Sequence, residues 1–354
     1  LVPQILWTGT HVPAAFCGIE DMTINSVDIP SHGLSTISIY NAYNCWVKNV
    51  ENRYPWFAEV FVDWSAHVTI EACYAHDSAS GGASLSYGFT PQSCSDVLIE
   101  NNIAYRITAP VLIQAGASGC VAAYNYCTNA LYGASHGWVA AALNLHGAHP
   151  TMNLFEGNKG TGIAFDVVHG SSSHNTAFRN LVYGYQTNLE NYPDFNLNNT
   201  VCVAVMSSNR NESIIGNVLG TSNINTNYED SVVNYPTIYN GNKWLVYWLG
   251  YWGNEGTLSP PTTNSDALTV TTLWRNGNYD TATLSTVWDS DGIKTLPSSL
   301  YLTGKPSWWG NLAWPPIGSD LSPKVSSLPA ELVFQQLSGS VIGSGTIGGS
   351  HFGP

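Results

Sequence analysis

One hydrophobic pattern is written twice in the middle of the chain. Residues 145–147 (LHG) are followed, ten positions after the leucine, by 155–158 (FEGN), and residues 168–170 (VHG) are followed at the same distance by 178–181 (FRNL). Each copy predicts a short apolar strand, a turn of small residues and a second apolar strand. The two copies lie 23 residues apart, and a repeat of that length indicates stacked structural units.

The repeat extends in both directions. The apolar position of the second strand recurs at Ile24, Val47, Ile70, Ile99, Ala123, Phe155, Phe178 and Ile215. The apolar position of the preceding strand recurs at Ile39, Val62, Phe89, Ile113, Leu145, Val168 and Val205. Eight or ten residues separate the two positions, whereas the return arm carries insertions at 76–88, 128–138 and 183–201. We expect these insertions to project from one side, which in repeat proteins is often the binding side.

A coil of this length fits three short strands and three turns, and stacking buries the apolar side that one coil cannot bury alone. Successive coils would lie about 4.8 Å apart, as hydrogen-bonded strands do. Asparagine recurs two positions after the second-strand position, at Asn49, Asn101, Asn125, Asn180 and Asn217. Because side-chain amides at one turn can bond to the next coil, the sequence predicts a buried asparagine ladder.

With these apolar columns and this ladder, the chain resembles the right-handed parallel β-helix, the pectin-lyase-like superfamily, over about residues 15–220. The resemblance implies an all-β solenoid and leaves the function open. We expect coils over 1–220 and, over 221–354, an irregular extension that packs on the solenoid and ends in a Gly/Ser-rich tail from about residue 338. Residues 272–292 and 296–320 look similar to the C-terminal region of bacterial secreted β-helix proteins, which implies an extracellular or cell-surface location.

The extension is rich in tryptophan, with eight of the 13 tryptophans between Trp244 and Trp314. We expect them to pack this segment along the solenoid; the alternative is that they form stacking platforms for sugars. Residues 243–252 (KWLVYWLGYW) fit either a helix or a strand.

The composition of the chain argues against some classes of binding partner. The chain carries 11 basic and 24 acidic residues, a net charge of −13, and only 10% of its residues are charged. An acidic, lysine-poor surface argues against nucleic acid as a partner. No run of 18 apolar residues occurs, so we expect no membrane span. The seven cysteines match no zinc pattern; we expect small core residues, with a Cys94–Cys120 disulfide as the alternative for an oxidising compartment.

Candidate chemistry lies on the outward face of the first strand, because alternate residues of a strand point outward. The predicted outward column contains Tyr40, Asp63, Thr90, Gln114, His146, His169 and Met206. His146 and His169 would lie on adjacent coils, about 5 Å apart, with Gln114 next in line. Asp166 falls on the inward register, where a carboxylate is costly unless paired, so we expect it to orient the histidines. The pattern predicts general acid–base catalysis by His146, His169 and Asp166.

Neighbouring side chains would bind the substrate. The predicted set is Gln114, Asp63, Tyr40, His149 and Trp138. A metal site is a further alternative if a third ligand converges on the two histidines, and the sequence identifies no cofactor. The alternative is that stacked imidazoles merely line the surface. Glu71, Glu100, Glu156 and Arg179 form the outward column of the second strand, where Glu156 and Arg179 are expected to make a surface ion pair worth less than about 1 kcal/mol.

Motifs of characterised β-helix enzymes are missing. The Asn-Thr-Asp triplet and the Asp-Asp pair of polygalacturonase-like hydrolases do not occur, and no acidic cluster accompanies an arginine, as in calcium-dependent pectate lyases. The leading hypothesis is an extracellular protein that recognises a polysaccharide on its outward histidine-bearing face, and the sequence leaves open whether the protein also cleaves it. The rival hypothesis is a non-catalytic structural or adhesive protein that forms homo-oligomers or filaments through its open solenoid ends and its tail.

Overall fold

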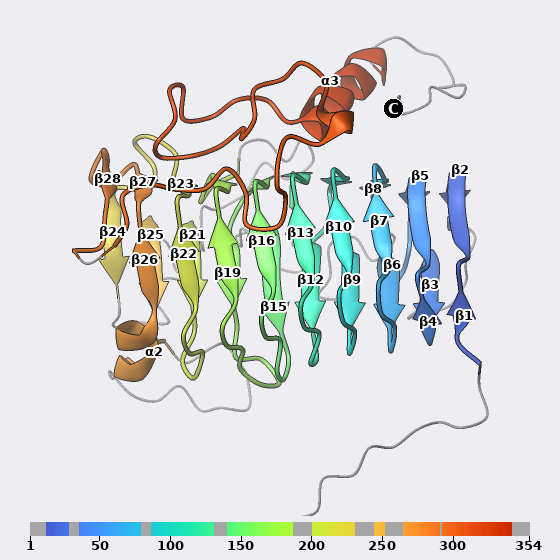
Figure 1. The fold of residues 1–354 in the computed structure, drawn as a ribbon, viewed down its shortest axis with the longest axis horizontal. Helices are drawn as coiled ribbons and strands as arrows, with labels where there is room; N and C mark the ends of the chain where they lie inside the picture. Colours follow the sequence, from blue (N-terminus) through green and yellow to red (C-terminus); the bar gives the residue numbers. More distant parts are fainter. Residues whose placement is uncertain are drawn as a thin grey trace, which may run out of the picture.

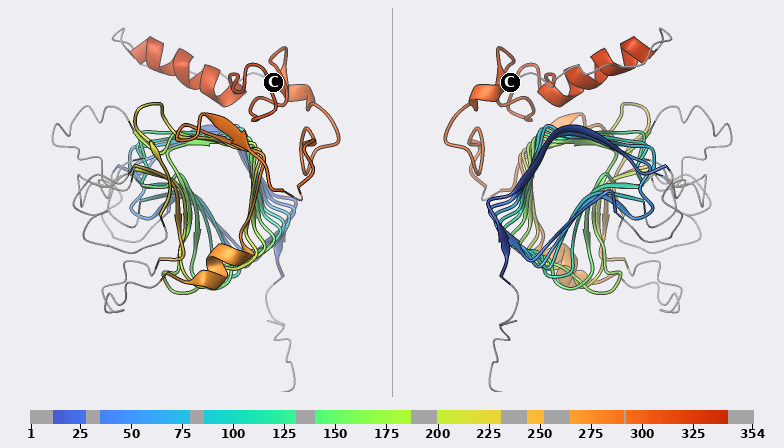
Figure 2. Two further views of the ribbon diagram at one scale, coloured as in Figure 1. Left: turned by 90° about the vertical axis from the view of Figure 1, so that its left-hand side faces the viewer. Right: turned by 90° about the vertical axis from the view of Figure 1, so that its right-hand side faces the viewer.

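The chain winds into a parallel β-helix, so that strands far apart in the sequence lie side by side along one axis (Figures 1 and 2). The structure is a computed structural model, and it describes residues 12–27, 35–78, 86–130, 140–186, 200–230, 244–251, 265–290 and 292–341. The predicted fold class is confirmed: the described chain is nearly all β, and its long sheets are built from parallel strands.

One side of each coil belongs to a nine-stranded parallel sheet. In spatial order its strands are β3 (Ile37–Tyr40), β6 (Ala58–Asp63), β9 (Tyr87–Gln92), β12 (Ala109–Gln114), β15 (Leu143–His146), β18 (Ile163–Phe165), β21 (Val201–Val205), β25 (Leu245–Leu249) and β24 (Asn227–Asp230). Residues 243–252 therefore contain a strand, one of the two forms that the sequence allowed.

The other sides of the coil belong to a 17-stranded sheet that turns a corner. The strands before the corner are β2 (Gly18–Asn25) and β5 (Trp46–Arg53), which also continue past it, then β7 (Thr69–Glu71), β10 (Leu98–Glu100), β13 (Val121–Ala123), β16 (Leu154–Glu156), β19 (Thr176–Phe178), β22 (Ser213–Ile215) and β26 (Trp274–Asn276). The strands after it are β8 (Tyr74–His76), β11 (Ile103–Tyr105), β14 (Tyr126–Thr128), β17 (Lys159–Gly160), β20 (Leu181–Val182), β23 (Val218–Leu219) and β27 (Asn278–Asp280).

A few elements lie outside this pattern. They are the short pair β1 (Ala14–Ala15) and β4 (Ala42–Tyr43), the antiparallel β28 (Ser285–Val287) beside β27, the helices α2 (Ala267–Thr272) and α3 (Pro329–Val341), and the 3₁₀ turn η1 (Ser307–Trp309). α3 includes residues 338–341, the first residues of the predicted Gly/Ser-rich tail. Residues 342–354 lie outside the described part of the chain.

The observed register confirms part of the predicted columns. The shared pairs include Val47 with Ile70, Ile70 with Ile99, Ile39 with Val62, and Ile113 with Leu145. Other positions were wrong: the columns contain Ile19, Ala122, Ala177, Ile214, Pro91 and Phe165 instead of Ile24, Ala123, Phe178, Ile215, Phe89 and Val168. At Ala122, Ala177 and Ile214 the shift is one residue, and a one-residue shift moves every side chain to the other face. Phe178 misled the prediction because it shares the outward column with Glu156 and is nevertheless buried.

The corner between the two strand columns explains the asparagine pattern. The residue that makes the corner has a left-handed backbone; these residues are Asn49, Ala72, Asn101, Tyr124, Gly157, Arg179, Gly216 and Gly277. The residue after each of these corner residues is buried. From the corner at Asn101 onward it is asparagine: Asn102, Asn125, Asn158, Asn180, Asn217 and Asn278. The sequence prediction merged these two adjacent positions. Asn49 and Asn101 make the corner, whereas Asn125, Asn180 and Asn217 form the ladder as predicted.

Each ladder asparagine bonds both to its neighbour's side chain and to the backbone. Asn125 Nδ2 donates to Asn158 Oδ1 at 2.9 Å and to the carbonyl of Ile99 at 2.9 Å, and its backbone N–H donates to the same Oδ1 at 2.9 Å. Asn125 Oδ1 in turn accepts the N–H and the Nδ2 of Asn102, both at 3.0 Å. One side chain therefore satisfies the strained corners of two coils, which are out of reach of water.

A second ladder lies at the corner where the chain leaves the nine-stranded sheet. Asn153 Nδ2 donates to Asn175 Oδ1 at 2.9 Å, and Asn175 is bonded in turn to the carboxyl group of Glu212. Glu212 Oε2 accepts the Asn175 N–H at 2.7 Å, and Oε1 accepts the Ser172 hydroxyl at 2.9 Å. Burial raises the pKa of Glu212 to about 7, although these hydrogen bonds oppose the rise. The ladder therefore ends on a titratable group.

Apolar side chains fill the space inside the coils, with Val62, Phe89, Ile113, Leu145 and Phe165 among them. All seven cysteines are free and six are buried, so the expectation of small core residues is confirmed and the Cys94–Cys120 disulfide was wrong. In the N-terminal coils, cysteine and valine occupy positions that asparagine takes further along, because the same small space accepts either an apolar side chain or a paired amide.

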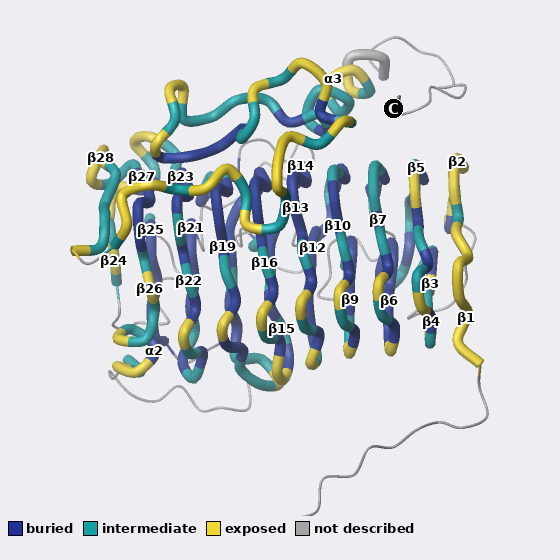
Figure 3. Tube along the Cα trace, in the orientation of Figure 1, coloured by how far each residue is buried: buried dark blue, intermediate teal, exposed yellow. Residues whose placement is uncertain are grey.

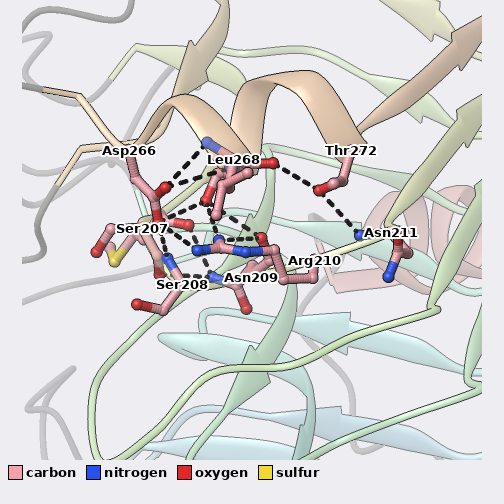
Figure 4. A network of polar contacts seen from close by, with 10 residues as sticks. Ser207, Ser208, Asn209, Arg210, Asn211, Asp266, Leu268 and Thr272 are labelled. Atoms are coloured by element: carbon pink, nitrogen blue, oxygen red, sulfur yellow. Dashed lines mark hydrogen bonds and ion pairs between the residues drawn. The ribbon is translucent and has the colours of Figure 1, made fainter.

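Parallel pairing continues past residue 220, the predicted end of the coils. β25 pairs with β21, and β26 and β27 pair with β22 and β23. Near the C-terminal end of the β-helix, residues 208–211 are hydrogen-bonded to α2 and to its N-cap residue, Asp266 (Figure 4). Asp266 caps α2 by accepting the N–H groups of Leu268 and Thr269, and it also binds Arg210 at 2.9 Å and the N–H of Ser208 at 2.8 Å.

Residues 292–341 run along the outside of the 17-stranded sheet, with α3 above its face (Figures 1 and 2). Trp309 is buried and its ring centroid lies 4.8 Å from that of Tyr124, and Trp314 Nε1 donates to the Tyr124 hydroxyl at 3.2 Å. Two residues of α3 contact the coils: Phe334 packs against Tyr105, and Glu331 lies 2.7 Å from Lys159 Nζ of β17. The tryptophans near η1 therefore pack the extension onto the coils, as expected.

The expected surface ion pair between Glu156 and Arg179 was wrong. Both side chains are buried under the extension. Arg179 binds Asp320 through two nitrogens, at 2.7 and 2.9 Å, whereas Glu156 accepts the Tyr124 hydroxyl at 3.0 Å and the N–H of Leu300 at 2.8 Å. Burial raises the pKa of Glu156. The sequence alone could not show that residues 140 positions away would cover this column.

The first coil contrasts with the rest, because its edge is exposed (Figure 3). In β2 most residues are exposed, and Met22 retains 48% of its accessible surface. Unpaired edge strands of this kind are templates for further strand pairing.

The ladder makes a direct prediction about stability. Replacement of Asn125 by Leu should lower the free energy of unfolding by about 1–3 kcal/mol, because buried partners in two coils lose their hydrogen bonds. Asn101→Gly is the matched control, because Asn101 makes the corner of the preceding coil and its Oδ1 makes no hydrogen bond. This substitution should lower the free energy of unfolding by less than about 0.5 kcal/mol. Urea unfolding followed by circular dichroism measures both values, and equal costs would contradict the ladder.

Glu212 predicts a pH dependence. Its pKa of about 7 in the folded chain exceeds the ordinary value of 4.5, so the folded state holds the proton more tightly. The stabilisation is complete below about pH 4.5 and is lost as pH rises through about 7, a change of about 3 kcal/mol. The unfolding free energy of the unmodified protein minus that of Glu212→Gln should fall by this amount between pH 4 and pH 8. A difference that is constant with pH would show that Glu212 has an ordinary pKa.

Candidate acid–base site

Polar side chains lie next to one another at the C-terminal ends of successive strands of the nine-stranded sheet. The pairs are Tyr40 with Asp63, Asp63 with Gln92, Gln92 with Gln114, and Gln114 with His146. The predicted neighbours Tyr40–Asp63 and Gln114–His146 are confirmed. Gln92 takes the place that the prediction gave to Thr90, because the register of β9 is shifted by two residues from the predicted one.

These side chains are linked by contacts as well as by register. Gln92 Nε2 donates to Asp63 Oδ2 at 3.3 Å. Burial raises the pKa of Asp63, and burial together with the nearby Asp63 carboxylate raises the pKa of the Tyr40 phenol. Tyr40 is 55% exposed, whereas Asp63 and Gln114 are buried. The column therefore offers one exposed ring at its N-terminal end and partly desolvated polar groups further along.

Asp166 belongs to this column, and its predicted inward orientation was wrong. Leu145 pairs with Phe165, so His146 and Asp166 are the next residues on adjacent strands. His146 Nδ1 lies 2.8 Å from Asp166 Oδ2, and Asp166 Oδ1 accepts the N–H of Val168 at 3.1 Å. Only 8% of the Asp166 side chain and 19% of the His146 side chain are exposed. The carboxylate is thus fixed by the backbone and holds the imidazole, which is the role expected of it.

His169 lies beside His146, as predicted, although it does so from a turn. Its backbone is left-handed, with φ of 62°, and its side chain is exposed. The two imidazole centroids are 5.4 Å apart with an interplanar angle of 83°. The prediction reached the right neighbour through a wrong register, because a turn at residues 168–170, after β18, brings the His169 imidazole beside His146.

His149 does not join the column. It is exposed in the turn after β15, and its Nε2 lies 3.0 Å from the hydroxyl of Ser173, which also contacts His174 Nδ1 at 3.0 Å. Trp138 and His136 lie outside the described residues. Gln92 and Ser173 were not among the residues predicted for the site. A signal for Ser173 exists, because Ser95, Ser118, Thr151 and Ser173 recur at one bridge position in successive turns.

The geometry of His146 and Asp166 has a chemical consequence. A carboxylate on Nδ1 fixes the imidazole as the Nδ1–H tautomer, which makes Nε2 the basic nitrogen. His169 supplies a second titratable ring within reach of the same space. Within the described ranges, no group of three His, Cys, Asp or Glu side chains is placed to hold a metal ion.

A separate charged cluster lies at the end of β8. His76 Nδ1 lies 2.8 Å from Asp77 Oδ2 and His76 Nε2 lies 3.1 Å from Glu51 Oε1. The two carboxylates raise the pKa of His76 against the effect of burial, and the histidine lowers the pKa values of both. Both ring nitrogens are engaged, so this histidine is suited to holding coils together rather than to proton transfer.

The chain matches no protein-family model, no curated protein and no solved structure. Among the residues that the structure describes, none of the helices is long and apolar enough to cross a membrane. The function must therefore be argued from the site itself.

The tautomer of His146 can be measured. Replacement of Asp166 by Ala removes the acceptor on Nδ1, so neutral His146 should change from the Nδ1–H form to a mixture of tautomers. Long-range ¹H–¹⁵N correlation spectra resolve the two forms. Asp96→Ala is the control, because Asp96 lies 3.8 Å from a different imidazole, that of His67, and should leave the His146 signals unchanged. If Asp166→Ala leaves the tautomer of His146 as it was, the orienting role assigned to the carboxylate is wrong.

Proposed function

We propose that this protein recognises an extended polysaccharide along the C-terminal ends of the strands of the nine-stranded sheet and cleaves it at His146 and His169. The observation that carries the proposal is the oriented pair of His146 and Asp166 with a second, exposed imidazole 5.4 Å away. A solenoid with aligned polar side chains on successive coils suits a ligand that is itself a repeating chain.

The pair supports cleavage through general acid–base catalysis. His146 Nε2 takes a proton from the attacking water in a hydrolysis, or from the sugar carbon that becomes part of the double bond in an elimination, while Asp166 stabilises the imidazolium that forms. His169 stands beside it to donate a proton to the departing sugar oxygen. One acceptor and one donor are what the cleavage of a C–O bond requires, and the cleavage chemistry needs no metal ion in this scheme.

The rest of the column supports binding. Gln92 and Gln114 carry both donors and acceptors, Asp63 carries acceptors, and all three can bond sugar hydroxyls. Tyr40 presents an exposed ring, and an aromatic face fits the apolar face of a pyranose. We further propose, on the strength of the parallel β-helix and its ladders, a relationship to the pectin-lyase-like superfamily and an extracellular or cell-surface location.

A second candidate function is assembly without catalysis. The exposed edge of β2 favours it, because an open edge can pair with a strand of another copy and such contacts can propagate into a filament. The two candidates differ in solution: assembly makes the sedimentation coefficient rise with protein concentration, whereas glycan recognition by a monomer does not.

Activity tests the primary proposal. Incubation with a panel of neutral and acidic polysaccharides, assayed for new reducing ends and for unsaturated products, should identify a substrate. The double variant His146→Gln/His169→Gln should then lose about 100-fold or more of that activity, because general acid–base catalysis contributes factors of this size. Its melting temperature should stay within about 2 °C, because glutamine at position 146 keeps a donor for Asp166 and His169 is exposed.

His67→Gln is the matched control, because His67 is an exposed histidine on the turn between β6 and β7 and contacts Tyr43 instead of the column. It should retain full activity. A double variant that cleaves at the rate of the unmodified protein contradicts the proposed site. A double variant that unfolds at a much lower temperature shows that the imidazoles hold the turns together instead.

A further inference from the structure

The hydroxyl group of Ser173 lies between two imidazoles. Its Oγ is 3.0 Å from His149 Nε2 and 3.0 Å from His174 Nδ1. Ser173 itself is buried, whereas both histidines are exposed, so the hydroxyl group lies just beneath a pair of surface rings. His149 comes from the preceding coil, since Thr151 pairs with Ser173. Two turns are thus needed to assemble the group.

The hydrogen count assigns roles to the two rings. A serine hydroxyl has one proton to donate, so one imidazole accepts it and the other donates an N–H to the oxygen. We propose that Ser173 is the nucleophile of a second, acyl-transfer site, with His149 Nε2 as its general base and His174 Nδ1–H holding the oxygen in place. His149 is assigned as the base because its Nε2 reaches Ser173 from a different turn, whereas His174 is the next residue in the chain.

Stacking explains the serine but not the histidines. Ser95, Ser118, Thr151 and Ser173 occupy the same bridge position in successive turns, so a small hydroxyl residue suits the turn. Among the hydrogen bonds of the described residues, only the Ser173 hydroxyl at this position is bonded to imidazole nitrogens. A nucleophile within hydrogen-bond reach of a base is the arrangement that covalent catalysis requires.

The reaction balances with an ester and water. Ser173 Oγ attacks the acyl carbon while its proton passes to His149 Nε2; the bond from that carbon to the alcohol oxygen then breaks, and the alcohol leaves with the proton. Water attacks the acyl-serine in the same way, releasing the carboxylic acid and the free hydroxyl group. The substrate class is therefore a carboxylic ester. Only the further step, that the alcohol is a sugar hydroxyl, rests on the proposed function.

The surrounding backbone limits the rate. The N–H groups of Ser173 and His174 donate to the carbonyls of Pro150 and Arg210, so these amides are not available to stabilise an oxyanion. Loss of a single oxyanion donor costs about 10²–10³ in rate in well-formed sites. We therefore expect slow turnover, and covalent capture is the more sensitive measurement.

The experiment uses the full chain and a fluorophosphonate probe, followed by peptide mass spectrometry. The expected result is one modified serine, Ser173, with labelling that falls about 100-fold in His149→Gln. Ser118→Ala, a change at the same bridge position without imidazole contacts, should label like the unmodified protein. His146→Gln/His169→Gln should also label normally, so failure of the polysaccharide proposal leaves this result intact.

Three results overturn the proposal. They are no labelling at millimolar probe, labelling of Ser118 or other serines at the same rate, and labelling of Ser173 that is unchanged in His149→Gln. The test does not require Ser173→Ala, a variant that could disturb the turn, because the site of modification in the unmodified protein and the labelling rate in His149→Gln decide the outcome. A slow release of acetate from 4-nitrophenyl acetate that disappears in His149→Gln, with an unchanged melting temperature, completes the positive outcome.

Discussion

Amide side chains that bond from one coil to the next are the interaction on which this structure depends. A coil of three short strands must turn sharply at its corners, and the peptide groups there point away from the regular sheet. Six buried asparagines, from Asn102 to Asn278, satisfy those groups and repeat at every coil from the fourth onward. A buried amide without its partner is costly, so the ladder stabilises the stack and also fixes the axial position of each coil.

That fixed position is what creates the candidate site. Once the coils are in register, the residue after each apolar strand end lies beside its counterpart, and His146 meets Asp166 without any further device. The same stacking brings His149 to Ser173 across two turns. The C-terminal extension covers the other face, where Arg179 binds Asp320 and Glu156 accepts two hydrogen bonds. Polar groups on that face hold the protein together, whereas beside β15 the His146 side chain is partly exposed and the His169 side chain is exposed.

Periodicity predicted the fold because stacking imposes it on every coil. Part of the apolar columns, such as Val47 with Ile70, and the ladder members Asn125, Asn180 and Asn217 were correct for this reason. Register was less predictable, since three-residue strands carry apolar residues on both faces where the extension covers them, as at Phe178. The proximity of His146 and His169 was predicted, but the place of Asp166 was not, because the prediction aligned Leu145 with Val168 instead of Phe165. Contacts with the extension, such as Arg179 with Asp320, carry no local signal at all.

Native-state hydrogen exchange tests the central claim most directly. The backbone N–H groups of Asn102, Asn125, Asn158 and Asn180 each donate to the next ladder side chain. If the ladder holds the stack, these amides exchange only when the whole solenoid unfolds, and their exchange free energies equal the free energy of global unfolding. Exchange of these four amides by local opening, several kcal/mol below the global value, would contradict the account.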